Sequence, residues 1–219
     1  MDEPIRRRWD QWFRDEKSYQ LDINYTPWLE RYSNLLQGLK SPLAIDLGCG
    51  RGFDTRFLIS TGLTTISADY SLGALDAARK TVPSSWLLQF DLRDHIPFGK
   101  GSFGLIVANL SLHYFSFSDT AKIINELYRV LSDEGWLIAR VNSTSDHGYE
   151  SVKEDDRMRI EEDYYVYHGI PRRYFRETTI RQFFSNGWMI DRIEEKKLVR
   201  YEKPKALWEF IARKTTIIP

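Results

Sequence analysis

The sequence predicts an α/β protein in which buried strands alternate with helices. Apolar runs of strand length alternate with segments of helical spacing from residue 43 onwards. The first run, Leu43–Leu47, opens directly into a loop with glycine on alternate positions, which is typical of a ligand-binding turn in such a sheet. At 219 residues, the chain suits one domain of this class with additions.

The overall composition restricts the compartment and the partners. Lys and Arg together number 31, as do Asp and Glu, so no overall field recruits nucleic acid, although a local basic patch stays open. The single cysteine, Cys49, cannot form an intrachain disulfide, and no signal peptide or membrane-spanning run is visible. We therefore expect a cytoplasmic protein with no membrane partner, and we expect Cys49 to be a small filler rather than a nucleophile.

Residues 1–40 are expected to form N-terminal helices. Residues 1–20 are loosely amphipathic and predict a helix lying on another surface; their aromatic residues are Trp9, Trp12, Phe13 and Tyr19. This helix could cap the core or act as a lid over a ligand, and both interpretations stay open. Thr26 and Pro27 predict the N-cap and first turn of a second helix, which ends at Gly38.

The loop after the first strand carries Gly48, Gly50 and Gly52. Glycine has no side chain to block a close approach and no penalty for positive φ, so the backbone here can contact a ligand. The segment Phe53–Thr61 has helical spacing of its apolar residues, which places the loop between a strand and a helix N-terminus. Open α/β sheets bind nucleotides at such a junction.

Asp46 distinguishes this loop from a dinucleotide-binding turn. It begins the pattern Asp-x-Gly-x-Gly-x-Gly, whereas the dinucleotide fingerprint is Gly-x-Gly-x-x-Gly. An acid before the first glycine is unfavourable for a pyrophosphate and favourable for a ligand that carries a positive charge. Asp46–Gly52 resembles the first motif of the class I S-adenosylmethionine-dependent methyltransferases, and the resemblance covers about residues 40–214.

The resemblance implies a Rossmann-like sheet of seven mostly parallel strands, with helices on both faces and an antiparallel last strand. It implies S-adenosylmethionine as the cofactor, residues 41–214 as the methyltransferase domain, and residues 142–176 as an insertion on the substrate side.

The second predicted strand, Thr64–Ala68, ends in Asp69. It follows the loop by roughly 20 residues, where an acid in nucleotide-binding α/β units accepts hydrogen bonds from ribose hydroxyls. A simple turn aspartate is the alternative. Tyr70 could pack beside an adenine, and Ser71 is a predicted N-cap of the next helix.

The third predicted strand, Ser85–Phe90, is followed by Asp91 and Leu92. The resemblance implies that this acid accepts the adenine amine while the neighbouring backbone reads a ring nitrogen. Residues and resemblance together nominate as cofactor-binding Asp46, Gly48, Cys49, Gly50, Asp69, Tyr70, Asp91, Leu92 and Asn109.

The fourth predicted strand, Phe103–Ala108, leads into Asn109 and His113. In the resembled fold, this strand end lies beside the first strand and faces the reactive methyl group. The segment lacks the Asn-Pro-Pro-Tyr signature of many nucleic-acid amino methyltransferases and resembles the small-molecule branch. His113 could act as a general base, orient the substrate or be a hydrogen-bonded structural residue.

The remaining regular elements follow in order. Residues Asp119–Leu131 predict an amphipathic helix, and Trp136–Val141 predicts the fifth strand. The chain closes with a predicted helix over Glu177–Asn186 and a hairpin that pairs Trp188–Glu194 with Leu207–Lys214.

Residues 142–176 are the most individual part of the sequence. The segment is too polar and irregular to predict a strand, and its charge run, Lys153–Asp163, indicates a solvated helix face. The aromatic residues of Tyr164–Tyr174 would expose much apolar area on a simple surface, so we interpret them as a substrate lid or pocket wall. The candidate catalytic residues are His113, Tyr164, His168 and Tyr174.

These features predict methyl transfer from S-adenosylmethionine to a small-molecule acceptor by in-line displacement. Such a reaction needs alignment and exclusion of water rather than a covalent triad. The four histidines lack metal-ligand spacing, so no metal site is expected. Three alternatives stay open: a non-catalytic binding module of the same fold, a methyltransferase acting on protein or nucleic acid, and a nicotinamide oxidoreductase, which Asp69 would suit and Asp46 would not. We expect a monomer or homodimer.

Overall fold

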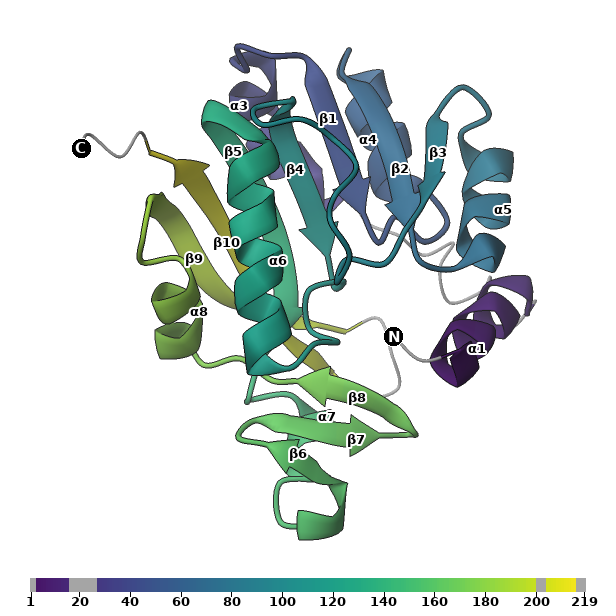
Figure 1. The fold of residues 1–219 in the computed structure, drawn as a ribbon, viewed down its shortest axis with the longest axis vertical. Coiled ribbons are helices and arrows are strands. Elements are labelled where there is room, and N and C mark those ends of the chain that lie inside the picture. The colour runs from purple at the N-terminus through teal and green to yellow at the C-terminus, as the bar shows by residue number, and fades with distance from the viewer. Residues whose placement is uncertain (1–2, 16–26, 200–203, 216–219) are drawn as a thin grey trace.

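The computed structural model describes residues 3–15, 27–199 and 204–215 and is built on one large sheet (Figure 1). Its seven strands lie in the order β3-β2-β1-β4-β5-β10-β9. The strands are β1 (Leu43–Leu47), β2 (Thr64–Asp69), β3 (Trp86–Gln89), β4 (Phe103–Asn109), β5 (Leu131–Asn142), β9 (Trp188–Leu198) and β10 (Lys205–Lys214). Strands β1 to β5 pair in parallel, whereas β10 pairs antiparallel with both β5 and β9. The predicted fold class is confirmed, including the antiparallel last strand.

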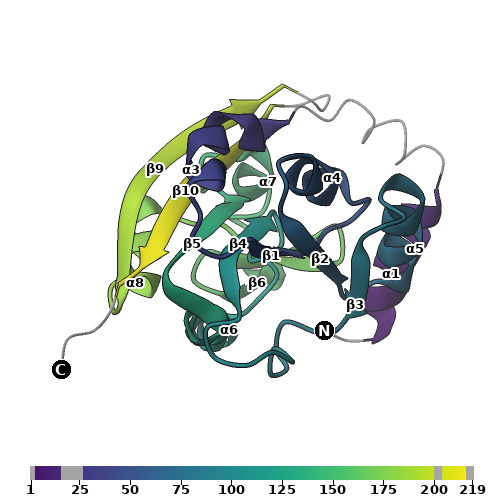
Figure 2. The ribbon, with the colours of Figure 1, turned by 90° about the horizontal axis from the view of Figure 1, so that it is seen from above.

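Helices cover both faces of this sheet (Figures 1 and 2). The helices are α1 (Glu3–Arg14), η1 (Trp28–Tyr32), α3 (Ser33–Gln37), α4 (Phe53–Ser60), α5 (Leu72–Thr81), α6 (Phe117–Val130), α7 (His147–Glu150), η2 (Asp156–Met158) and α8 (Glu177–Phe183). Successive strand residues point to opposite faces. Ile45 and Ile106 therefore pack in the core cluster that contains α6, while Ala44 and Leu105 pack in the cluster that contains η1, α3 and α4.

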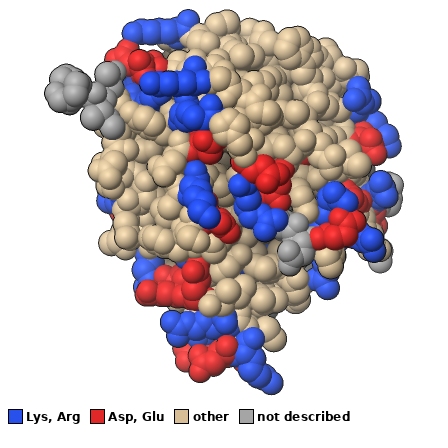
Figure 3. Space-filling model, in the orientation of Figure 1, with Lys and Arg blue, Asp and Glu red and all other residues tan. Residues whose placement is uncertain are grey.

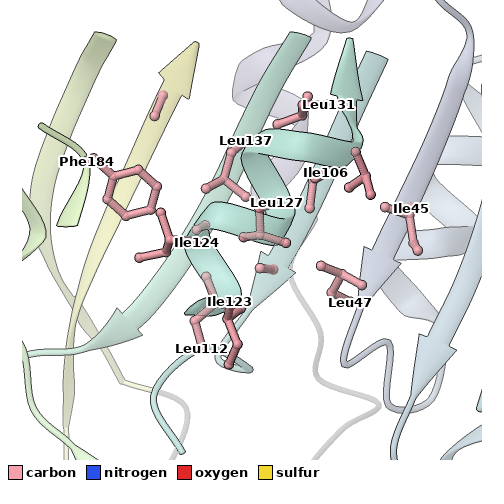
Figure 4. Packing of buried hydrophobic residues seen from close by; sticks show 14 of the residues in the cluster. Ile45, Leu47, Ile106, Leu112, Ile123, Ile124, Leu127, Leu131, Leu137 and Phe184 are labelled. Atoms are coloured by element: carbon pink, nitrogen blue, oxygen red, sulfur yellow. The ribbon is translucent and has the colours of Figure 1, made fainter. Parts of the chain in front are cut away.

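Helix α6 covers the centre of one face. Its Ile123, Ile124 and Leu127 lie against the sheet beside Ile106 and Leu137 (Figure 4). Residues spaced by three or four positions share one side of a helix, which explains why these side chains are buried together.

Side-chain caps set where two of the helices begin. The Ser71 hydroxyl accepts a hydrogen bond from the Ala74 N–H at 3.1 Å, which confirms the predicted cap of α5. The Ser116 hydroxyl accepts from the Asp119 N–H at 3.0 Å, so α6 begins at Phe117 rather than at the predicted Asp119.

The segment 142–176 contains a second, three-stranded antiparallel sheet. Its strands are β6 (Arg159–Glu161), β7 (Tyr164–Tyr167) and β8 (Ile170–Arg173). The prediction of a segment without strands, and of a helix face in its charge run, was wrong. Strand β7 reads Tyr-Tyr-Val-Tyr, which suits a strand, and His168 and Gly169 form a tight turn with φ values of 49° and 71°.

The N-terminal segment has two parts with different neighbours. Helix α1 packs against α5 at one side of the large sheet (Figure 1). In contrast, η1 and α3 bury Trp28, Leu29 and Leu36 against the sheet. The predicted N-cap Thr26 and the predicted amphipathic position Tyr19 lie outside the described residues.

The surface carries charges of both signs. On the face shown in Figure 3, Lys and Arg side chains are interspersed with Asp and Glu side chains. Within the described ranges, no helix is long and apolar enough to cross a membrane.

Candidate cofactor and acceptor site

A pocket of about 260 Å³ opens at the carboxyl ends of β1, β2 and β4, where the strand order of the large sheet reverses. Ligands of open α/β sheets bind at this switch point. Eight of the nine predicted cofactor-binding residues line the pocket: Gly48, Cys49, Gly50, Asp69, Tyr70, Asp91, Leu92 and Asn109. The structure thus brings together residues from four separate strand ends.

The glycine loop passes close to the end of β4. Gly48 has a φ of 72°, and a Cβ atom there would lie 2.4 Å from Cβ of Ser111. The N–H groups of Gly48 and Cys49 both donate to the carbonyl of Ala68, at 2.8 and 3.0 Å, which fixes the loop on β2. Glycine is therefore required at position 48 by both conformation and space.

Cys49 is buried in this loop. Burial raises the pKa of its thiol well above the ordinary value. A buried, protonated thiol is a poor nucleophile, so the side chain packs as a small apolar group against Leu75 and Ala78.

Asp69 connects the loop to the start of α5. Its carboxylate accepts hydrogen bonds from the N–H groups of Gly50 at 3.0 Å and Ser71 at 2.9 Å. Burial raises the pKa of this carboxyl to about 6, although the hydrogen bonds from these backbone groups lower it. Each carboxylate oxygen has a second lone pair, so the group can still accept a hydrogen bond from a ligand.

Asp46 lies beneath the loop and does not line the pocket. Only 1% of the residue is exposed, and its carboxylate accepts a 2.7 Å hydrogen bond from the Thr55 hydroxyl. Burial, and then the negative charge of Asp54, raise its pKa well above the ordinary value. The structure therefore does not support the predicted direct contact between Asp46 and a positively charged ligand.

Asp54, which sequence reasoning missed, is the acid that faces the pocket from helix α4. Its two oxygens accept from Nε1 of Trp28 and from Nδ2 of Asn109, both at 2.7 Å. The remaining polar atom of Asn109, Oδ1, is buried in the pocket wall without a hydrogen-bond partner among the described residues. The only sequence signal for Asp54 is an acid in the first turn after the glycine loop.

The opposite end of the pocket is formed after β3. Asp91 and Leu92 line it together with Phe90. The Asp91 carboxylate accepts from the Arg93 N–H at 2.9 Å and from its Nη2 at 2.8 Å, and burial raises the pKa of the acid. This arrangement places one apolar and one acidic wall side by side.

Helix α1 covers the pocket. Trp9, Trp12 and Phe13 are part of the lining. Asp10 anchors the helix, because its carboxylate accepts from the Ser71 hydroxyl at 2.6 Å and from the Gly73 N–H at 3.0 Å. The same helix therefore packs on the start of α5 and forms part of the pocket wall, and its role as a lid stays a prediction.

None of the four predicted catalytic residues lines this pocket. His113 is 1% exposed, its ring centroid lies 4.3 Å from that of Tyr114, and neither ring nitrogen has a hydrogen-bond partner among the residues described. Burial, followed by the charges of Lys205 and Arg172, lowers the pKa of His113 well below its usual value. The imidazole is therefore neutral, and the predicted alternative of a hydrogen-bonded structural histidine is not what the structure shows.

The other three candidates have different surroundings. The Tyr164 hydroxyl donates to the carbonyl of Tyr114 at 3.0 Å, and burial raises its pKa to about 12. His168 is exposed at the β7–β8 turn, where its carbonyl accepts from Nη1 of Arg8 at 2.7 Å. Tyr174 is 1% exposed, and its hydroxyl has no partner in the described part of the chain.

None of the aromatic rings of Tyr164–Tyr174 lines the pocket at the strand ends, so the expected substrate lid or pocket wall is not part of this pocket. Tyr165 and Tyr174 instead form a separate small core with Val152. Tyr149 and Tyr167 pack against this core, so much of the apolar area that suggested a lid is buried within the segment itself.

Arg173 attaches this small sheet to the end of β4. Its N–H donates to the carbonyl of His113 at 2.7 Å, its Nε donates to that of Phe115 at 3.2 Å, and its Nη1 donates to that of Glu162 at 3.2 Å. It also forms an ion pair with Glu161, and burial lowers its pKa to about 10. Sequence reasoning missed this residue, which looks like one more arginine in a charged segment.

No group of three or more His, Cys, Asp or Glu side chains within residues 3–15, 27–199 and 204–215 could hold a metal ion.

The sheet order, the glycine loop and the acid at the end of β2 define a class I S-adenosylmethionine-dependent methyltransferase fold. Residues 45–139 match the methyltransferase domain family. The matched residues run from β1 into β5 and include the glycine loop, Asp69 and Asn109.

Two curated relatives each match less than half of the chain. An uncharacterized methyltransferase of Synechocystis is 35% identical over 91 residues, which are 42% of this chain and 42% of the relative. The mitochondrial arginine-hydroxylase NDUFAF5 of Homo sapiens is 31% identical over 99 residues, 44% of this chain and 28% of the relative. The chain thus spans less than half the length of these curated relatives in each alignment.

Solved structures share the fold over most of the chain. A methyltransferase from Methanosarcina mazei aligns with a TM-score of 0.74 and 19% identity, covering 87% of this chain and 98% of that one. The 1,6-didemethyltoxoflavin-N1-methyltransferase of Burkholderia thailandensis, with bound 1,6-didemethyltoxoflavin and S-adenosylhomocysteine, aligns with a TM-score of 0.69 and 16% identity, covering 97% and 88%.

Proposed function

We propose that the protein transfers a methyl group from S-adenosylmethionine to a small-molecule acceptor. The observation that carries this proposal is the pocket in which the glycine loop after β1, the Asp69 carboxylate of β2 and the Asn109 amide of β4 meet. The match of residues 45–139 to the methyltransferase domain family supports it.

The pocket walls fit the parts of this cofactor. The Asp69 carboxylate, with free lone pairs, suits a ribose diol, while Asp91 and Leu92 provide an acidic and an apolar contact for adenine. The unpartnered Oδ1 of Asn109 suits the ammonium group of the amino-acid part, and Gly48 lines the same pocket. The bound sulfonium supplies an activated methyl group and departs as a neutral thioether.

The protein's own contribution is to orient the reactants and to exclude water. Oriented approach alone can supply roughly 7–11 kcal/mol of the barrier reduction. Trp9 and Trp12 of α1 cover the pocket, and Asp10 holds that helix on α5. We infer that α1 closes over the cofactor before transfer.

We assign the contact with the acceptor to His113 and Tyr174. Both are buried, and their side-chain polar atoms have no partner among the described residues. The neutral imidazole can accept a proton if the acceptor must lose one. Tyr164 and His168 are weaker candidates, because the first donates its hydroxyl to the Tyr114 carbonyl and the second is exposed at a turn.

Calorimetric titration with S-adenosylmethionine tests the first step. We expect the intact protein to bind it and Gly48→Val to lose it, because the valine side chain would occupy the space next to Ser111. No binding by the intact protein, or equal binding by both proteins, would contradict the proposal.

Turnover distinguishes the proposal from its rivals. S-adenosylhomocysteine formed only in the presence of an acceptor supports methyl transfer, whereas binding without this product over a broad small-molecule panel indicates a binding module. Because one relative is named an arginine-hydroxylase, the assay includes an arginine-containing peptide and looks for a gain of one oxygen. Steep salt dependence of RNA or DNA binding would favour a nucleic-acid acceptor.

A cytoplasmic location and a monomeric or homodimeric state stay predictions.

A further inference from the structure

Two cationic side chains near His113 have no acidic partner in the part of the chain that the structure describes. Within the described ranges, Arg172 of β8 and Lys205 of β10 form no ion pair and donate no side-chain hydrogen bond, and Nε of Arg172 is buried. The guanidinium of Arg172 lies 5.4 Å from the ring centroid of Tyr167. Burial, and then the charge of Arg172, lower the pKa of Lys205 to about 8, so the two cations lie within electrostatic reach of each other.

Two buried neutral groups share this environment. His113 is within electrostatic reach of both Lys205 and Arg172, and Tyr174 is within reach of Arg172. Both residues are 1% exposed, and both ring nitrogens of His113 and the hydroxyl of Tyr174 lack hydrogen-bond partners among the residues described. We call Arg172, Lys205, His113 and Tyr174 the cationic cluster.

Asp146, the acid that acts on Lys205, does not neutralise the cationic cluster. Asp146 is within reach of Lys205, but its Oδ1 accepts from the Gly148 N–H at 2.9 Å and its Oδ2 accepts from the Ala206 N–H at 2.8 Å. This carboxylate already accepts from two backbone donors. Among the described residues the environment therefore carries a net positive charge on two half-buried cations, and removing such charge from water without a partner is unfavourable.

The cationic cluster adjoins the cofactor pocket at Tyr114. Tyr114 lines that pocket, and its ring centroid lies 4.3 Å from the His113 ring. Tyr174 is within electrostatic reach of Tyr114 as well. The cluster thus lies on the β4 side of the pocket, away from the adenine walls formed after β3.

We propose that the cationic cluster binds an anionic group, a carboxylate or a phosphate, of the methyl acceptor. The proposal rests on the proposed function, since the cluster matters to catalysis only if the neighbouring pocket holds the methyl donor. Arg and Lys side chains only donate hydrogen bonds, and the Tyr hydroxyl and the imidazole can each donate one. An anion satisfies all of these donors together, whereas a neutral or cationic acceptor would leave both charges unpaired.

The test uses the intact protein saturated with S-adenosylhomocysteine and titrated calorimetrically with three probes. Benzoate and phenyl phosphate carry the two candidate anions, and benzamide is their neutral counterpart. Arg172→Gln and Lys205→Gln each remove one charge, and we expect each to weaken binding of the preferred anion by about tenfold. Arg157→Gln is the matched control, because its guanidinium is exposed and pairs with Asp155 on the same insertion.

Each outcome decides a separate point. Tighter binding of benzoate or of phenyl phosphate identifies the anion as carboxylate or phosphate, provided that both cluster variants weaken it and the Arg157 control does not. Equal binding of benzamide, unchanged anion binding in both variants, or no anion binding at tens of millimolar overturns the anion site. We expect the affinity for S-adenosylhomocysteine to be unchanged in all variants, which shows that they are folded. If the parent protein does not bind S-adenosylhomocysteine, the proposed function is overturned instead.

Discussion

The cofactor side and the proposed acceptor side of the molecule are built in different ways. On the cofactor side, Gly48, Asp69 and Asn109 each lie at the end of a strand of the large sheet or directly after it. On the acceptor side, the cationic cluster combines Arg172 of the small sheet with Lys205 at the start of the last strand. The first side follows from local sequence patterns, whereas the second depends on the docking of distant segments.

This difference has a consequence for what each side tolerates. The cofactor side depends on backbone conformation, so a single added methyl group at a glycine can destroy it. The acceptor side depends on side-chain charges and on the attachment of the small sheet through Arg173. Substitutions can therefore disable one side and leave the other intact.

Gly48→Ala is expected to break the cofactor side most strongly. The new Cβ would lie 2.4 Å from Cβ of Ser111 at a residue whose φ is 72°, so the loop or the end of β4 must move. A displacement of this kind costs on the order of 100-fold in a site that depends on alignment, and we expect that loss in calorimetric affinity for S-adenosylhomocysteine. Binding of the anion probes to the cationic cluster should change little.

Gly62→Ala is the matched control for this change. Gly62 has a φ of 92°, and a Cβ added there would meet no atom within 4 Å, so alanine adds backbone strain without a clash. We expect a lower melting temperature and unchanged cofactor affinity. Equal losses of affinity in the two variants would show that strain, rather than contact with Ser111, explains the requirement for glycine.

The large sheet could be predicted well because each of its elements has a local signal. Leu43–Leu47 was predicted with the same bounds as β1, and the Asp69 position followed from the end of β2. Glycines, caps and apolar periods each act within a few residues, so they are readable from one sequence. Eight of the nine nominated cofactor positions consequently lie in one pocket.

The small sheet and several site contacts could not be predicted because their partners are far apart in the chain. Strands β6, β7 and β8 have only three or four residues each, which is too short for a clear sequence pattern. Their pairing with one another makes them strands. Asp54 meets Trp28 26 positions earlier, and Arg173 meets Phe115 58 positions earlier. The exception among local signals is Asp46, whose charge suggested a ligand contact although the side chain points into the protein.

Arg173→Leu is expected to loosen the acceptor side alone. The change removes two side-chain hydrogen bonds to carbonyls and the ion pair with Glu161 from a residue that is 2% exposed. We expect the free energy of unfolding to fall by about 3 kcal/mol, with faster amide exchange in β7 and β8. Cofactor affinity should stay within a few-fold of the parent value.

Arg181→Leu provides the comparison for Arg173→Leu. Arg181 is exposed and pairs with Glu177 on the same helix, so its loss should have little effect on unfolding or exchange. If both variants are destabilised equally, or if exchange in β7 and β8 is unchanged in Arg173→Leu, the attachment through Arg173 is not what holds the small sheet.

The pH dependence of cofactor binding is expected to report Asp69. Burial raises its pKa to about 6, so the carboxylate becomes protonated, and loses the ability to accept both ribose hydrogen bonds, as the pH falls through that value. S-adenosylhomocysteine affinity should be constant above pH 7, fall as the pH drops through about 6, and level off about tenfold lower once the carboxyl is protonated. Asp69→Asn should bind about tenfold more weakly at pH 7.5 and lose this pH dependence. A parent-like acid limb in Asp69→Asn would assign the titration to another group.

Asp10→Ala is expected to have the smallest effect and to act through the cover of the pocket. The carboxylate accepts hydrogen bonds from the Ser71 hydroxyl at 2.6 Å and the Gly73 N–H at 3.0 Å, so its loss frees helix α1 from the start of α5. The stability cost should be about 1 kcal/mol, typical of a lost helix cap, and cofactor should dissociate about fivefold faster in a stopped-flow experiment. Glu3→Ala, which breaks only pairs at the surface of the same helix, should leave the dissociation rate unchanged. Asp10 contacts neither the glycine loop nor the cationic cluster. Faster release of the cofactor with unchanged anion binding would therefore place α1 on the cofactor side. An equal loss of anion binding would mean that the helix covers both sides together.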